Sequence, residues 1–132
     1  MGFSVVAVEL LDGANPAVLA TVGADGTPQT SVVWVGRDGD DLVVSTQLGR
    51  QKDTNLRNHP RASLLVIDKA DPDRYVEFRG PATVTEDVGR AVAVRLAELY
   101  AGPGAGEEYL QLPAEVIRTV IRITPERTIE HV

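Results

Sequence analysis

The stretch AVLATVGADGTPQTSVVWVGRDGDDLVVST, residues 17–46, carries the pattern that decides the fold. Two Asp-Gly turns, at residues 24–27 and 37–40, separate three runs rich in Val and Thr. An Asp-Gly pair between β-prone runs predicts a tight hairpin. We therefore expect strands at residues 17–22, 28–36 and 41–46 that pair in sequence as a meander.

The rest of the chain continues the β pattern and adds helices. Further strands are expected at residues 61–68, 75–85, 116–123 and 127–131, for a body of about six strands. Helices are expected at residues 4–11, 49–58, 87–100 and 107–112. The third is amphipathic, and its apolar face is expected to consist of Val88, Ala91, Val92, Leu96 and Leu99. Short hairpins followed by one long, late helix describe a small antiparallel barrel rather than alternating βαβ units. We predict a mainly β protein of one domain, residues 1–132.

Two of the later strands have patterns that predict where they lie. Residues 64–67, Leu-Leu-Val-Ile, are an unbroken apolar run, which is typical of a central strand covered on both faces. Residues 75–85 alternate, so one set is expected to face the core: Val76, Phe78, Gly80, Ala82 and Val84. Pro81 has no N–H for a ladder, so we expect it at a sheet edge or a bulge.

Composition excludes several classes of protein. The chain has no cysteine, so it forms neither a disulfide nor a thiolate metal site. A net charge of −6 argues against nucleic-acid binding, which depends on cationic surface. Residues 1–11 lack the features of a signal peptide, and no apolar run approaches the roughly 20 residues of a membrane span. We expect a cytoplasmic protein without a membrane or nucleic-acid partner.

The common catalytic patterns are also missing from the sequence. The two histidines, His59 and His131, belong to no spaced ligand set, so no metal site is predicted. The glycine-rich stretch 102–106 follows a helix and has Glu107 in place of the last glycine of a dinucleotide fingerprint. Catalytic residues stay unassigned, although Tyr75, Tyr100 and Tyr109 are candidate proton donors.

One segment reverses the sign of the chain's charge. Between Arg50 and Arg61 there are four basic residues against the single acid Asp53. Ser45 and Thr46 end the preceding strand, Gly49 allows a tight turn, and a helix with free N–H groups follows. This combination suits a phosphate held by Arg50 and Lys52. The alternative is a solvated helix face with a chance cluster of cations.

Residues 19–84 resemble the pyridoxamine 5′-phosphate oxidase-like superfamily, and more narrowly its flavin/deazaflavin oxidoreductases of the B type. The resemblance rests on short motifs in the right order: Ala20-Thr21-Val22, Asp25-Gly26-Thr27-Pro28-Gln29, Ser31-Val32-Val33-Trp34-Val35, Ser45-Thr46, Gly49-Arg50-Gln51-Lys52, Asn55-Leu56, Pro60-Arg61 and Arg74 to Gly80. It implies a six-stranded antiparallel split β-barrel, an intertwined homodimer, and FMN or the deazaflavin coenzyme F420 bound at the subunit interface.

The resemblance also implies site residues. Those expected to hold the cofactor phosphate are Ser45, Thr46, Arg50, Gln51 and Lys52, with Asn55 supporting the turn. Those expected along the ring and its side chain are Gln29, Ser31, Val33 and Trp34. Residues 74–79 would reach the partner's site.

Departures from the superfamily pattern refine the expected function. Pyridoxamine phosphate oxidases carry extra basic residues on the second strand, where this chain has Thr30 and Val35, and an Arg- and Trp-rich tail that residues 123–132 lack. We therefore do not expect pyridoxamine oxidation and favour F420 over FMN. The expected reaction is hydride transfer from reduced F420 to an unsaturated or quinone-like small molecule. The alternatives are an FMN-binding oxidoreductase and a non-catalytic carrier of a flavin, F420 or haem.

Overall fold

The computed structural model describes residues 2–132, so Met1, at the start of the amino-terminal stretch discussed above, lies outside the described residues. The described residues form eight strands: β1 (Ala17–Val22), β2 (Pro28–Val33), β3 (Val35–Asp38), β4 (Asp41–Gln47), β5 (Arg61–Ile67), β6 (Tyr75–Glu86), β7 (Arg118–Ile123) and β8 (Arg127–His131). The α-helices are α1 (Val5–Asp12), α2 (Gln51–Asn58), α3 (Ala91–Ala101) and α4 (Glu107–Leu110). A 3₁₀ turn, Val88–Arg90, precedes α3.

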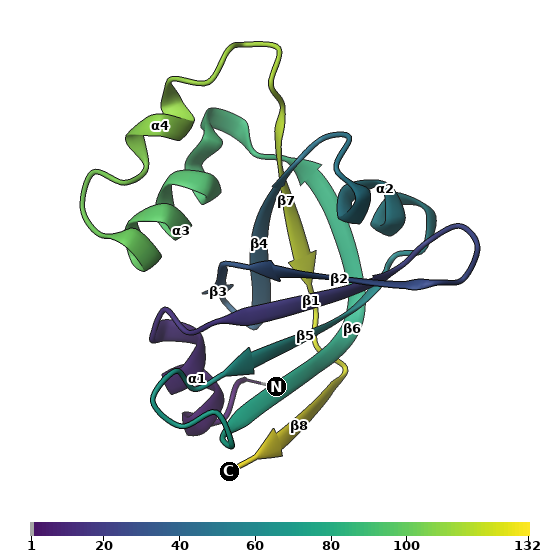
Figure 1. Ribbon diagram of the computed structural model, residues 1–132, viewed down its shortest axis with the longest axis vertical. Coiled ribbons are helices and arrows are strands. Elements are labelled where there is room, and N and C mark those ends of the chain that lie inside the picture. Colours follow the sequence, from purple (N-terminus) through teal and green to yellow (C-terminus); the bar gives the residue numbers. More distant parts are fainter. Residues whose placement is uncertain (1) are drawn as a thin grey trace.

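The strands form one curled antiparallel sheet in the order β2-β1-β5-β6-β7-β4-β3, with β8 paired to β6 (Figure 1). The long strand β6 joins the two halves, because its first part pairs with β5 and its last part, from Ala82, pairs with β7. Pro81 lies at this handover, where its missing N–H interrupts no continuous ladder. The predicted mainly β, split-barrel fold is confirmed, with eight strands rather than about six.

The predicted meander is wrong, although both Asp-Gly hairpins form. The expected strand at 28–36 breaks at Trp34 into β2 and β3, and these pair with β1 and β4 respectively. Consequently β2 and β4 do not pair. The physical reason is closure: a sheet that curls into a barrel must bend its strands, and this bend sends the chain from one half of the sheet to the other. Local turns fix each hairpin but not the sheet it joins.

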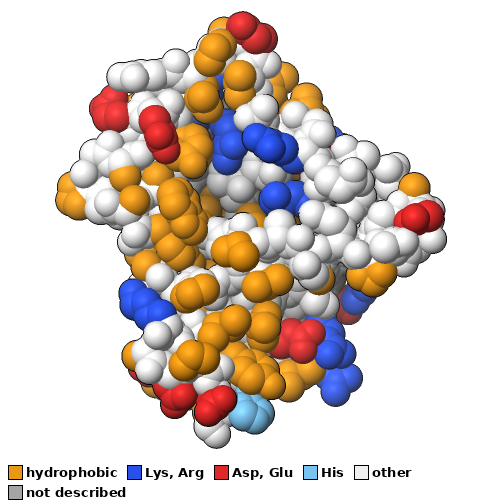
Figure 2. All heavy atoms as spheres, viewed as in Figure 1, with side chains coloured by type: hydrophobic (Ala, Val, Ile, Leu, Met, Phe, Trp, Pro, Cys, Tyr) orange, Lys and Arg blue, Asp and Glu red, His pale blue; other side chains and the backbone are white. Residues whose placement is uncertain are grey.

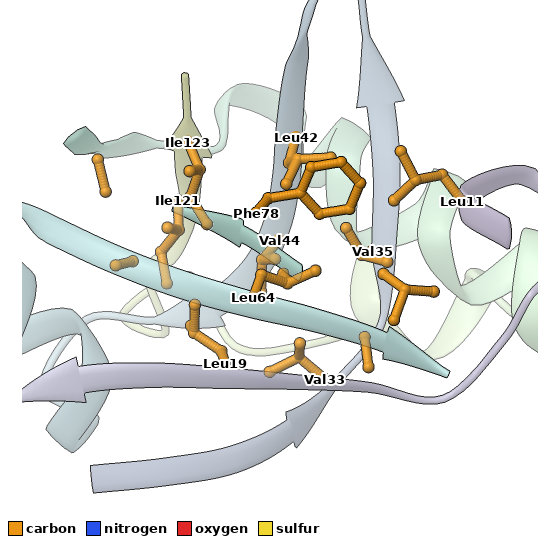
Figure 3. Packing of buried hydrophobic residues seen from close by; sticks show 14 of the residues in the cluster. Leu11, Leu19, Val33, Val35, Leu42, Val44, Leu64, Phe78, Ile121 and Ile123 are labelled. Carbon is orange, nitrogen blue, oxygen red and sulfur yellow. The ribbon is translucent and has the colours of Figure 1, made fainter. Parts of the chain in front are cut away.

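The core lies between the two halves of the curled sheet. Buried side chains from both halves meet there, including Leu19, Leu64, Phe78, Val44 and Ile121 (Figure 3). The core-facing set predicted on β6 is confirmed, with Val84 half-buried against the same cluster. A Cβ on Gly80 would lie 2.0 Å from the Thr124 carbonyl oxygen, so close passage of the β7–β8 connection requires glycine.

Two expectations about buried faces are corrected. In the 64–67 run, Leu64 and Val66 are buried but Leu65 and Ile67 are only half-buried. The reason is that only one face of β5 packs against the core. In α3, the buried residues are Ala93, Leu96 and Ala97, and Val88 is 79% exposed. Gly89 and Arg90 have left-handed backbone conformations, so the regular helix begins only at Ala91. Its apolar face is therefore rotated relative to the face predicted for a helix that begins at residue 87.

None of the helices in residues 2–132 has the length and apolar character required to cross a membrane.

Candidate functional site

A cleft of about 290 Å³ opens where α2, the β2–β3 bend, β4, β7 and the α3–α4 region meet. Six residues predicted from the sequence line it: Val33, Trp34, Ser45, Thr46, Arg50 and Lys52. Four further residues complete the lining: Val32, Ala93, Tyr109 and Arg118. Figure 2 shows Lys and Arg side chains gathered in a hollow beside the α3–α4 region. The cleft therefore collects positive charge from two separate segments of an acidic chain, the start of α2 and the start of β7.

The turn from β4 into α2 places two of these cations. Gly49 has φ +94°, the left-handed conformation that favours glycine, and the Arg50 N–H donates to the Gln47 carbonyl (3.0 Å). Arg50 is the N-cap residue of α2, and Lys52 follows in the first turn. The buried Asp53 carboxylate fastens this helix, because it accepts hydrogen bonds from Arg57 Nε and Thr119 Oγ1, each at 2.7 Å. The helix N-terminus adds its partial positive charge at the cleft.

The three cleft cations are Arg50, Lys52 and Arg118, and within residues 2–132 none forms an ion pair with a carboxylate. Burial lowers the pKa of Lys52, and the neighbouring charges of Arg50 and Arg118 lower it further. Burial is also the main reason that the pKa of Arg118 is lowered. A bound anion would offset both the desolvation and the mutual repulsion of these groups.

Arg118 is the site residue that the sequence reasoning missed. Its Nη2 donates to Ser45 Oγ (2.8 Å), its guanidinium lies 5.0 Å from the Tyr109 ring centroid, and its Nε is buried without a protein partner among the described residues. The only sequence signal is a cation at the start of the largely apolar stretch 118–123, which contains a second arginine, Arg122. Because Arg118 meets Ser45 only through the pairing of β4 with β7, the sequence alone did not connect them.

Trp34 supplies a flat aromatic surface at the cleft. Its ring stacks on Tyr100 with 5.4 Å between centroids and 15° between planes, and 37% of the residue is exposed. The Tyr100 hydroxyl donates to the Asn15 carbonyl (2.7 Å) and accepts from the Val35 N–H (3.2 Å). Burial raises the pKa of Tyr100. Tyr100 therefore supports the Trp34 platform, and its proton is already engaged by the backbone.

Four predicted site residues do not line the cleft: Gln29, Ser31, Gln51 and Asn55. Gln51 Nε2 donates to Asn55 Oδ1 (2.6 Å), and Asn55 Nδ2 donates to Thr21 Oγ1 (3.0 Å). Thr21 Oγ1 in turn donates to Gln29 Oε1 (3.1 Å). We call this chain of four side chains the α2 relay; it ties α2 to the β1–β2 hairpin. Cofactor contacts by these residues stay a prediction.

The other predicted site residues, apart from Tyr109, lie outside the cleft. Ser31 Oγ is buried with no hydrogen-bond partner among the described residues. Tyr75 stacks on His131, 4.8 Å between centroids, on β6 and β8. In the 74–79 segment, Arg74 pairs with Glu9 and Asp68, and Arg79 pairs with Glu77. No group of three metal-binding side chains occurs within residues 2–132. Tyr109 is thus the one tyrosine in the described chain that borders the cleft.

Fold and site together define a split β-barrel with a cleft lined by three cations. The family model for pyridoxamine 5′-phosphate oxidase matches residues 6–131. The chain belongs to this family, whose fold is that of flavin-binding oxidoreductases. A pyridoxine/pyridoxamine 5′-phosphate oxidase from Cupriavidus metallidurans is 35% identical over 74 residues, which are 55% of this chain and 34% of that protein. The chain thus spans about a third of that relative's length.

Solved structures extend the likeness to the whole chain. A protein named as an F420 reductase has 32% sequence identity and a TM-score of 0.78, over 92% of this chain and 94% of its own. The haem storage protein of Vibrio cholerae has a TM-score of 0.72 over 98% of this chain and 95% of its own. At 18% identity, that second likeness concerns the fold alone.

Proposed function

We propose that this protein is an F420-dependent reductase that passes a hydride from the reduced deazaflavin to an unsaturated or quinone-like small molecule. The observation that carries the proposal is the cleft, where Arg50, Lys52 and Arg118 lie without carboxylate partners among residues 2–132, next to the partly exposed Trp34 ring. Three such cations fit an anionic tail, and a flat aromatic surface fits a planar ring.

The cleft residues have separable roles in this proposal. Arg50, Lys52 and Arg118 hold the phosphate and the acidic tail, and the Ser45 hydroxyl keeps the Arg118 guanidinium in place. Trp34 and Val33 lie along the ring. When bound, F420 supplies hydride-transfer chemistry; the protein binds, orients and shields it from water. Tyr109 is the cleft tyrosine with a hydroxyl available to donate a proton to the acceptor.

We favour F420 over FMN as the cofactor because of the positions of the cations in the cleft. Thr30 on β2 is exposed and Val35 at the start of β3 is fully buried, so neither position brings charge to the cleft. The positive groups come instead from α2 and the start of β7, along an open edge that an extended anionic tail can follow. The 32% identity to the F420 reductase over nearly the whole chain supports the same choice.

A homodimer is part of the proposal, because the cleft of one chain is at the lower end of the roughly 300–1,000 Å³ typical of cofactor-sized pockets. Beside it lies the outer face of β1, β2 and β5, where Val18 pairs with Val32 and with Leu65 in one apolar row. Val32 is 78% exposed and also borders the cleft. Figure 2 shows apolar side chains spread over this face. A second copy on it would cover Leu65 and enlarge the cleft.

The decisive experiment is a cofactor titration. Trp34 is the single tryptophan of the chain, so its fluorescence reports ligand at the cleft directly. We expect quenching by F420 at lower concentration than by FMN, and oxidation of bound reduced F420 by at least one quinone or enone. Tighter FMN binding would instead indicate the FMN-dependent alternative. Tight F420 binding without any transfer would indicate a carrier, and haem binding in preference to both would indicate a haem protein.

The dimer has its own test. Leu65→Asp places a charge on the outer face, and we expect it to give monomers in sedimentation velocity and to weaken F420 binding. Val88→Asp is the matched control, since Val88 is equally apolar and 79% exposed but lies at the 3₁₀ turn before α3. A wild-type protein that sediments as a monomer in the presence of F420 would rule out this part of the proposal.

A further inference from the structure

We propose that Arg90 is the positioning residue of the cleft: its guanidinium fixes residues 109–116 so that Tyr109 and Arg118 face the bound ligand. This inference rests on the proposed function only in treating the cleft as a ligand site. Arg90 itself does not line the cleft, and nothing in its sequence context marks it as functional.

The hydrogen bonds of Arg90 are directed at one stretch of backbone. Nη1 donates to the carbonyl oxygens of Tyr109 (2.9 Å) and Leu112 (2.7 Å). Nη2 donates to those of Pro113 (2.7 Å) and Val116 (3.0 Å). Four acceptors from a single loop are thus gathered on one planar group. Lysine has no such fork of fixed donors, so the geometry is particular to arginine.

The backbone at Arg90 is held in an unusual conformation that serves this contact. Arg90 has φ +57°, in the left-handed region that non-glycine residues rarely adopt. Its N–H donates to the Asp87 carbonyl (2.9 Å), while the Asp87 carboxylate accepts from the N–H groups of Val92 (3.0 Å) and Ala93 (2.9 Å). Such a conformation persists where the surroundings determine it strongly. Here the surroundings are the cap of α3 and the four loop carbonyls.

The loop has few other attachments, so the Arg90 contact decides its position. α4 packs on α3 and on the 88–90 turn. At its start, Gly106 fits so closely that a Cβ there would lie 2.5 Å from Val94 Cγ1. At the far end, the Ile117 carbonyl accepts from the Leu48 N–H (2.9 Å) just before β7 begins. Between these two points, Arg90 is the side chain that fixes the carbonyls on either side of the bend.

This arrangement couples Arg90 to the two cleft residues through short covalent paths. It binds the carbonyl of Tyr109 itself and that of Val116, two residues before Arg118. Tyr109 and Arg118 also touch each other across the loop, with the guanidinium 5.0 Å from the ring centroid. Arg118 is also anchored by the pairing of β7 with β4, so releasing residues 109–116 would displace the aromatic wall and remove the ring that packs on the Arg118 guanidinium.

The test compares Arg90→Gln and Arg90→Lys with Arg95→Gln, which removes an exposed arginine from α3, the helix that Arg90 precedes. Hydrogen exchange of the ligand-free protein should show faster exchange of amides 106–117 in both Arg90 variants, with the amides of β1, β5 and β6 unchanged. F420 affinity, read from Trp34 fluorescence, should fall roughly tenfold in Arg90→Gln, equivalent to about 1.4 kcal/mol. Arg95→Gln should match the wild type in both measurements.

A double-mutant cycle separates positioning from general destabilisation. If Arg90 acts through the cleft wall, Tyr109→Ala should weaken F420 binding clearly in the wild type but by less than twofold in the Arg90→Gln background. Additive losses, exchange that rises equally across the barrel, or unchanged exchange of 106–117 would each overturn the inference. Failure of the proposed function looks different: the wild type would then prefer FMN or haem, bind F420 without transferring a hydride, or bind none of these groups. Hydrogen exchange, and affinity for inorganic pyrophosphate, would still decide the role of Arg90.

Discussion

The two sides of α2 carry polar residues of similar density but opposite character. On the cleft side, Arg50 and Lys52 meet Arg118, and no carboxylate among residues 2–132 pairs with any of them. On the other side, the α2 relay runs from Gln51 through Asn55 and Thr21 to Gln29, with each member hydrogen-bonded to the next. Both sides were predicted to hold the cofactor. Only the cleft side leaves charge without a protein partner.

Whether the polar groups have protein partners separates a candidate binding site from a structural network on the same helix. A satisfied buried network stabilises the fold, and each of its bonds contributes about 1 kcal/mol. Neighbouring cations that share a partly buried site repel one another and lower the stability of the ligand-free protein. An anion that binds only the folded state reverses this loss. Substitutions on the two sides should therefore change different measured quantities.

Lys52→Ala should give the largest effect on binding. Loss of one charged hydrogen bond weakens binding by about 1.5–3 kcal/mol, so F420 affinity should fall by at least tenfold. The free energy of unfolding should stay the same or rise slightly, because one of three repelling cations is removed. Trp34 fluorescence titration and urea unfolding measure the two quantities. Unchanged affinity would remove Lys52 from the site.

Asn55→Ala should have a comparable effect on stability instead. Asn55 is 2% exposed, and its loss leaves the Gln51 amide without its acceptor and Thr21 with Gln29 as its one partner in the relay. The free energy of unfolding should fall by about 1–3 kcal/mol, measured by urea denaturation. F420 affinity should change less than threefold at a temperature where the variant is folded. A loss of affinity equal to that of Lys52→Ala would show that the relay belongs to the ligand site.

Arg57→Ala is to be compared with Lys52→Ala, because both remove a cation from α2. Arg57 pairs with the buried Asp53, whereas Lys52 has no such partner among residues 2–132. Arg57 is itself 45% exposed, and Thr119 still donates to Asp53 in the variant. We expect a loss of about 1 kcal/mol in the free energy of unfolding and no change in F420 affinity. Weakened F420 binding in this variant would mean that the helix acts by its total charge rather than through its cleft side.

The smallest expected effect is on pH dependence. Burial and the neighbouring arginines hold the pKa of Lys52 below the usual lysine value of about 10.4. The folded protein therefore releases this proton before the unfolded chain does, so ligand-free stability gains slightly as pH rises between the two pKa values. Anion binding needs the charged form, and affinity for pyrophosphate should fall over that interval. Lys52→Arg should abolish the fall; a fall that persists would assign it to another group.

Parts of the fold and of the site were predictable because they depend on neighbours in the sequence. Both Asp-Gly hairpins, the alternation of β6 and the turn at Gly49 are set within a few residues. The clustering of Arg50 and Lys52 with Ser45 follows from the same local turn. The break at Trp34 was not predictable, because residues 32–35, Val-Val-Trp-Val, all favour a strand and only barrel closure requires the bend.

The sequence by itself determined a mainly β chain, two tight hairpins and a basic helix start, since propensity and turn geometry act over short distances. Only the tertiary structure decided that Arg118 joins that helix start, that the α2 relay faces away from the cleft, and that Arg90 holds the Tyr109 loop. The physical reason is that strand pairing between β4 and β7 joins segments about seventy residues apart, a choice made by packing of the whole core rather than by any local pattern.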